Sequence, residues 1–198
     1  MRSPSMTTRS PARRRSSAAD LALITTFAAV IGVCAVLPAI TGVAGVPFTL
    51  QMFGIFIAGA LLGPIRGFLA VLLYLAVATA GVPIFTQGQA GPGVWAGTTG
   101  GYLLAFPFAA LLVGAAAALV ARRGPAVFTV TVALVAAVVT VAVVGTLGTL
   151  GMARAMDVPL GVAWGYATPF FLVDIVKGAL AAVVAAAVHR AFPQLLRG

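Results

Sequence analysis

Apolar runs of about twenty residues follow one another along this chain, and an α-helix needs a run of that length to cross a lipid bilayer. The first extends from Leu21 to Ile40, which is longer than the apolar core of a cleaved signal peptide. Hydrophobic residues make up 62% of the 198 residues and charged residues only 8%, whereas a soluble domain carries about 25% charged residues. The sequence therefore predicts an integral membrane protein.

Glycine, proline and arginine punctuate the apolar runs, so we predict an all-α bundle of six transmembrane helices. The helices are expected over residues 20–41, 48–62, 67–80, 100–121, 126–150 and 166–188. Residues 1–19, rich in Ser, Pro and Arg, are expected to form a disordered basic tail, and residues 20–198 the transmembrane domain. Six spans leave no room for a soluble catalytic or nucleotide-binding domain.

The basic residues predict how the bundle is oriented, because cytoplasmic loops carry an excess of Lys and Arg. With both termini in the cytoplasm, ten of the twelve basic residues fall inside, Arg154 lies in an outer loop and Lys177 lies within the last helix. The net charge of +9 is then expected to face anionic lipid headgroups of the cell membrane rather than nucleic acid. The irregular segments, including residues 81–99, face outward in this orientation.

Asp174 and Lys177 stand three residues apart in the last helix, about two turns from its predicted start, and so share one helical face. Ionisable residues are costly inside a membrane and usually face a cavity or a partner. One interpretation is a buried pair that only holds the bundle together. The other is a ligand-binding pair that places an acceptor and a cation together in a dry site.

The segment between the third and fourth predicted helices is rich in glycine and carries polar and aromatic side chains. Hydrogen bonds to a ligand can come from Thr86, Gln87, Gln89, Thr98 and Thr99. Trp95 and Tyr102 offer flat apolar walls. The segment is either part of a binding site or an interfacial loop whose tryptophan anchors it at the membrane surface.

Thr49 and Gln51, at the top of the second helix, are weaker candidates for ligand contacts, because such residues often bond neighbouring backbone. Ala28 and Gly32 are small residues four apart in the first helix. This spacing allows close helix packing, usually inside the protein and less often against another subunit. We name both residues as candidates for partner docking.

Several chemistries lack the residues that they need. The sequence has no phosphate-binding G-x-x-x-x-G-K-[ST] loop, no cluster of metal ligands, and three acidic residues in all. We therefore expect no enzyme, no catalytic residue, no metal and no cofactor. From the residues alone, a self-sufficient channel or an ion-coupled carrier with Asp174 as its ion handle stays open.

Four ordered motifs resemble the BioY family of biotin transporters. Val46-Pro-Phe-Thr-Leu-Gln51 is similar to the family's V-P-x-T-L-Q, and Gly81-Val-Pro-Ile-Phe85 to its G-x-P-V-F. Gly97-Thr-Thr-Gly-Gly-Tyr102 resembles G-P-T-G-G-Y, with Thr98 in place of proline. Pro169-Phe-Phe-Leu-Val-Asp-Ile-Val-Lys177 resembles P-F-x-P-G-D-x-x-K, with Leu172 and Val173 in place of Pro-Gly.

The resemblance implies a six-helix subunit that captures biotin on its extracytoplasmic side, with Asp174 and Lys177 as ligand contacts. It also implies partners, namely a transmembrane coupling subunit and two cytoplasmic ATPases of an energy-coupling factor (ECF) module, although some members are thought to work without a dedicated set. Biotin chemistry fits these residues, because Asp174 can accept from a ureido N–H and Lys177 can donate to the ureido carbonyl or to the carboxylate. A pocket for thiamine or riboflavin could be built from similar materials.

Overall fold

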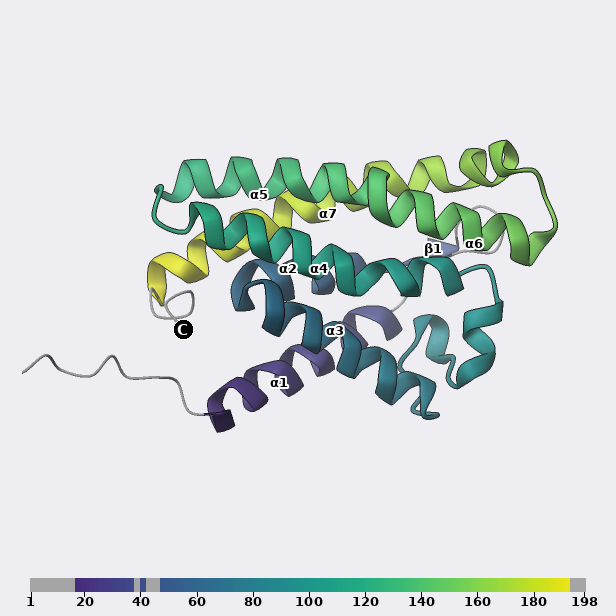
Figure 1. Ribbon diagram of the computed structural model, residues 1–198, viewed down its shortest axis with the longest axis horizontal. Coiled ribbons are helices and arrows are strands. Elements are labelled where there is room, and N and C mark those ends of the chain that lie inside the picture. The colour runs from purple at the N-terminus through teal and green to yellow at the C-terminus, as the bar shows by residue number, and fades with distance from the viewer. Residues whose placement is uncertain (1–16, 38–39, 42–46, 193–198) are drawn as a thin grey trace, which may run out of the picture.

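The computed structural model describes residues 17–37, 40–41 and 47–192, and helices dominate them (Figure 1). The first half contains α1 (Ser17–Val36), α2 (Gln51–Leu62) and α3 (Pro64–Thr79). The second half contains α4 (Gly100–Val120), α5 (Pro125–Val139), α6 (Thr146–Met156) and α7 (Leu160–Ala191). Two-residue strands, β1 (Ile40–Thr41) and β2 (Pro47–Phe48), pair antiparallel before α2. The predicted all-helical fold is thus confirmed, apart from this short pair.

The predicted helix ends need correction at several positions. Helix α1 ends at Val36 rather than Thr41, since Thr41 belongs to β1, and α2 begins at Gln51 because Phe48 belongs to β2. The last helix begins at Leu160 rather than at Tyr166. Residues 17–19 of the expected tail are helical, and residues 1–16 lie outside the described part of the chain.

Helix α2 is the centre of the bundle, and all of its residues except Phe53 are buried. It packs against α1, α3, α4 and α7, while α5 packs mainly on α7 and α4. Small residues allow the closest approaches: a Cβ on Gly59 would overlap the carbonyl of Ala110, and one on Gly114 would overlap Pro64. The site described below therefore rests on a helix that is held on all sides.

Gly-Pro pairs make the tight turns between α2 and α3 and between α4 and α5. Gly63 (φ +81°) and Gly124 (φ +84°) adopt left-handed conformations that favour glycine. Pro64 and Pro125 then occupy the first helical position, where a missing N–H does no harm. Figure 1 shows both turns at the end of the bundle where α1 begins and α7 ends, opposite the segment that joins α3 to α4.

Four helical segments are long and apolar enough to cross a membrane, among the described residues: Ser17–Val36, Gly100–Val120, Pro125–Met156 and Leu160–Ala191. Two further apolar helices, α2 and α3, have 12 and 16 residues. At 1.5 Å per residue these rise about 18 and 24 Å, less than the roughly 30 Å of a bilayer's hydrocarbon core. The predicted helix order is therefore present, with two segments shorter than a complete crossing.

A π-helical segment, η4 (Thr140–Gly145), joins α5 to α6 within one continuous apolar span. The widened turn lies next to α7, where the ring of Phe171 approaches the Cα of Gly145 so closely that a Cβ would overlap it. Upstream of this turn the span packs mainly on α7, and downstream of it mainly on α4, although each half also contacts the other helix. Such π segments are frequently found at functional sites.

Candidate ligand-binding site

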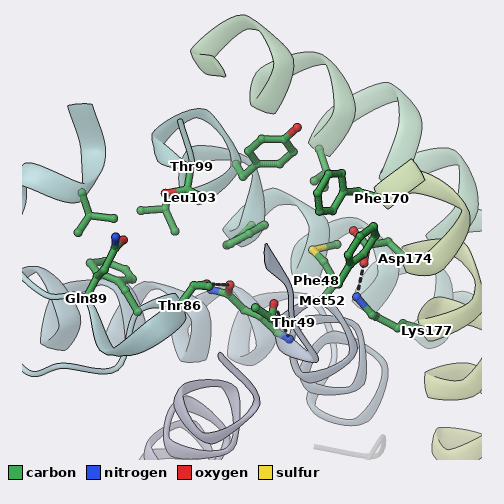
Figure 2. Close-up of a pocket in the computed structure, with 16 residues that line it drawn as sticks. Phe48, Thr49, Met52, Thr86, Gln89, Thr99, Leu103, Phe170, Asp174 and Lys177 are labelled. Atoms are coloured by element: carbon green, nitrogen blue, oxygen red, sulfur yellow. Dashed lines mark hydrogen bonds and ion pairs between the residues drawn. The ribbon is translucent and has the colours of Figure 1, made fainter. Parts of the chain in front are cut away.

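A cavity lies between α2, α4, α7 and the segment that follows α3 (Figure 2). About 670 Å³ of its space, the open mouth included, is not filled by protein atoms. Its polar lining is supplied by Thr49, Gln51, Thr86, Gln89, Thr99, Tyr102, Asp174 and Lys177. The apolar lining is Phe48, Met52, Phe85, Val94, Leu103, Phe106, Val144 and Phe170.

Asp174 and Lys177 form an ion pair on the cavity wall, with Lys177 Nζ donating to Asp174 Oδ1 at 2.7 Å. Their side chains are 14% and 11% exposed. No other hydrogen bond reaches this carboxylate or this ammonium from the described residues, so each keeps capacity for a ligand. The pair lies about 21 Å along α7, near its middle rather than two turns in as predicted, because the helix begins at Leu160.

Tyr102 contributes a hydroxyl that is buried and has no hydrogen-bond partner among the described residues. Its ring lies on Gly148 of α6, where a Cβ would overlap the ring carbons. Orphaned buried hydroxyls are unfavourable and rare. Tyr102 also lines the cavity, so a bound molecule that reaches this hydroxyl would give it a partner.

Aromatic rings form the apolar wall beside the charged pair. The rings of Phe48 and Phe170 are stacked, with centroids 4.2 Å apart and planes inclined by 20°. Figure 2 shows Phe48, Phe170 and Met52 on the same side of the cavity as Asp174 and Lys177, with Gln89 on the opposite side. A ligand in this cavity would meet charge and flat apolar surface together.

Gln51 is buried, and its side-chain amide is already engaged on both sides. Its Nε2 donates to the hydroxyl of Tyr74 at 2.9 Å, and its Oε1 accepts from Thr86 Oγ1 at 3.2 Å. Thr49 Oγ1 accepts from the backbone N–H of Gln51 at 3.3 Å, near the start of α2. Thr49 and Gln51, just before and at the start of α2, thus line the cavity and also hold its wall in place.

Two of the predicted contacts, Gln87 and Trp95, do not line this cavity. The backbone of Gln87 adopts a left-handed conformation (φ 59°) in the short 3-10 helix η2 (Thr86–Gly88), and its side chain is exposed at a polar hollow beside the cavity mouth. Trp95, in η3 (Pro92–Ala96), donates its indole N–H to Thr79 Oγ1 at 2.9 Å. The tryptophan thus fastens the segment to α3 instead of covering the cavity.

Ala28 and Gly32 are buried in the protein rather than presented to a partner. A Cβ on Gly32 would lie 3.5 Å from the side chain of Ile84, and α1 packs on α3 and α2. The face proposed for docking is therefore occupied by the chain itself, in agreement with the commoner use of such spacing.

Gln89 and Thr99 were named only among the possible hydrogen-bonding residues of their segment and were not selected as site residues, and the apolar lining was not predicted. Both polar residues lie in the glycine-rich segment that attracted attention, but nothing in the sequence distinguishes Gln89 from Gln87. The phenylalanines at positions 48, 85 and 170 occur inside the quoted motifs, and that was the signal available for finding them.

Comparison with known proteins places these observations in a family context. The sequence pattern of the BioY family matches residues 6–194. A biotin transporter BioY from Rhizobium etli is 31% identical over 182 residues, which cover 90% of this chain and 97% of that protein. A biotin transporter BioY from Rhodobacter capsulatus is 43% identical over 95 residues, which cover 48% of this chain and 50% of that protein.

A solved structure has the same fold. It is a 2.1 Å crystal structure of the S-component for biotin from an ECF-type ABC transporter. The two chains are 26% identical, with a TM-score of 0.77, over 87% of this chain and 92% of the other. The likeness therefore extends over most of this chain.

Proposed function

This chain belongs to the BioY family, and on that premise we propose that it takes up biotin by binding it in the cavity between α2, α4 and α7. The members to which it is similar are transporters rather than enzymes, as the sequence predicts. The residues proposed to contact biotin, or to hold those that do, are Asp174, Lys177, Tyr102, Thr86, Thr49 and Gln51.

The observation that carries this proposal is the match between the cavity wall and the chemistry of biotin. The ureido group of biotin has two N–H donors and one carbonyl, and its tail ends in a carboxylate. The free acceptor capacity of Asp174 suits a ureido N–H, and the remaining donors of Lys177 suit a carbonyl or carboxylate oxygen. The stacked Phe48 and Phe170 offer apolar surface to the ring system and the tail.

The proposal includes an orientation in the cytoplasmic membrane. We infer six membrane segments with the N-terminus and the C-terminus on the cytoplasmic side, so that the cavity mouth faces away from the cytoplasm. One end of the bundle holds the two tight turns and the last residues of α7 (Figure 1), and the basic residues there are Arg66, Arg122, Arg123 and Arg190. Arg154 belongs to the opposite end. This distribution supports the assignment.

For energy, we propose a transmembrane coupling subunit and two cytoplasmic ATPases of an ECF module. The support is the S-component of an ECF-type ABC transporter that shares the fold. The alternative, an ion-coupled carrier that works alone, would use Asp174 as an ion handle. That carboxylate is engaged by Lys177 at 2.7 Å, which makes it a poor free handle.

Titration of the detergent-solubilised chain with biotin, thiamine and riboflavin tests the ligand. Saturable binding of biotin alone is the expected result, and preference for another vitamin would overturn the assignment. Uptake into vesicles by this chain alone, abolished by a proton uncoupler and indifferent to ATP, would favour the ion-coupled carrier.

Cysteine labelling tests the orientation. Cys34 is the only cysteine and is replaced first by alanine. With a membrane-impermeant maleimide on intact cells, Ala90→Cys should be labelled and Arg123→Cys should not, since both positions are exposed but lie at opposite ends of the bundle. The reverse pattern would invert the proposed topology.

A further inference from the structure

Residues 82–95, in the segment that follows α3, are tied to that helix by four hydrogen bonds, and two of them use helix side chains. The backbone N–H of Val82 donates to the carbonyl of Val77 at 3.3 Å, and that of Gly91 donates to the carbonyl of Ala78 at 2.9 Å. The side-chain bonds run from the Tyr74 hydroxyl to the carbonyl of Ile84 at 3.2 Å and from the Trp95 indole to Thr79 Oγ1 at 2.9 Å.

Tyr74 has the most buried of these side chains and lies behind the cavity. Its exposed fraction is 0%, and it is not among the residues that line the cavity. Its ring meets the ring of Phe85 edge to face, with centroids 5.8 Å apart and planes at 87°. Phe85 does line the cavity, so the phenol stands directly behind part of the wall.

The hydroxyl of Tyr74 also joins two parts of the wall that come from different elements. It accepts from Gln51 Nε2 of α2 and donates to the carbonyl of Ile84, while Thr86 donates to the other end of the Gln51 amide. One oxygen atom therefore connects α2, α3 and the loop through an unbroken chain of three hydrogen bonds. Buried networks with every member satisfied hold a unique geometry.

We propose that Tyr74 is a positioning residue for the biotin site, which holds Phe85 and Thr86 in their binding arrangement without touching the ligand. The inference rests on the proposed function for the identity of the ligand. It assigns a role to a residue outside the cavity and explains why the Gln51 amide faces two protein partners. A preformed wall loses less conformational freedom when a ligand binds, and this raises affinity.

The test is Tyr74→Phe, which keeps the ring and its contact with Phe85 but removes the oxygen. Gln51 Nε2 and the carbonyl of Ile84 then lose a buried partner, so we expect biotin to bind about tenfold more weakly. Val71→Ala is the matched control, because Val71 is equally buried on the same helix and does not line the cavity. It should lower the unfolding temperature and leave the dissociation constant unchanged.

A double-mutant cycle separates positioning from a general loss of stability. If Tyr74 acts through Gln51 and Thr86, the loss of affinity in Tyr74→Phe/Thr86→Val is smaller than the product of the two single losses. The losses in Val71→Ala/Thr86→Val should instead multiply. Multiplicative losses in both pairs, or a Tyr74→Phe effect no larger than that of Val71→Ala, overturn the proposal.

Amide hydrogen exchange in the unliganded protein gives a readout that needs no ligand. Residues 82–91 should exchange faster in Tyr74→Phe than in wild type or Val71→Ala, and equal rates overturn the proposal. Failure of the wild-type chain to bind biotin would overturn the proposed function instead, and the exchange result would still decide the role of Tyr74.

Discussion

The change Asp174→Asn removes one negative charge while it keeps the size and shape of the side chain, so it isolates the electrostatic part of biotin binding. The carboxylate is 14% exposed and accepts one hydrogen bond, from Lys177. Its remaining acceptor capacity is the part proposed to meet a ureido N–H. A hydrogen bond to a charged group contributes about 1.5–3 kcal/mol, so biotin affinity should fall roughly tenfold to 150-fold.

Stability must be followed separately, because the same change leaves Lys177 without its partner. Breaking a buried ion pair costs about 3–5 kcal/mol, and we expect the lower end because both side chains retain some exposure. The double change Asp174→Lys/Lys177→Asp restores a pair at the same i,i+3 spacing with the charges exchanged. It should recover the unfolding temperature but not biotin binding, since donor and acceptor now stand at the wrong places.

The assay is isothermal titration of the detergent-solubilised variants with biotin, next to their thermal unfolding. Arg154→Gln serves as the control, because Arg154 is an exposed charge of α6 outside the cavity lining. Equilibrium binding that is unchanged in both Asp174→Asn and Lys177→Ala would refute the site. Recovery of biotin binding in Asp174→Lys/Lys177→Asp would show that the two charges only stabilise the helix bundle.

Two further predictions concern positions around the cavity. Gly148→Ala should displace the ring of Tyr102, with which a Cβ would overlap, and cost about 1–3 kcal/mol of stability together with biotin affinity. Gly161→Ala is its control, because a Cβ there meets no atom within 4 Å; a loss of binding in Gly161→Ala, or none in Gly148→Ala, would contradict the reasoning. Gln87→Gly removes the strain of a left-handed backbone (φ 59°) outside the cavity, so the free energy of unfolding should rise by up to about 1 kcal/mol. Titration should give the wild-type dissociation constant for biotin, and a large loss of affinity would show that Gln87 belongs to the site.

The sequence predicted the helices and the charged pair well because both depend on simple energetic rules. A long apolar run can satisfy its backbone inside a bilayer only as a helix or in a closed barrel, so composition alone narrows the fold. Asp174 and Lys177 stood out since charge inside such a run needs a reason. The structure brings both to the cavity wall, as it does with Thr49, Gln51, Thr86 and Tyr102.

Such rules could not predict the contacts of the segment between α3 and α4, because hydrogen bonds to other elements decide which way each side chain points. Trp95 turns away since Thr79 offers an acceptor for its indole, and that acceptor lies 16 residues earlier in another element. Gln87 and Gln89 are chemically equal, and the backbone angles of the short helix η2 decide which one reaches the cavity. The start of α7 was missed because Gly161 and Gly165 resemble a loop in composition.

The widened turn at Thr140–Gly145 holds one residue more than a regular α-helical turn would need. Deleting one of its residues would close the helix and keep the downstream phase, whereas everything downstream would rotate by about 100° if all six residues wound as an ordinary α-helix. Gly148 and Gly151, whose bare faces admit Tyr102 and Gly101 of α4, would then point elsewhere. The widened turn therefore absorbs the surplus residue and keeps the two halves of one span in phase, and the position of Gly148 under the Tyr102 ring depends on that phase.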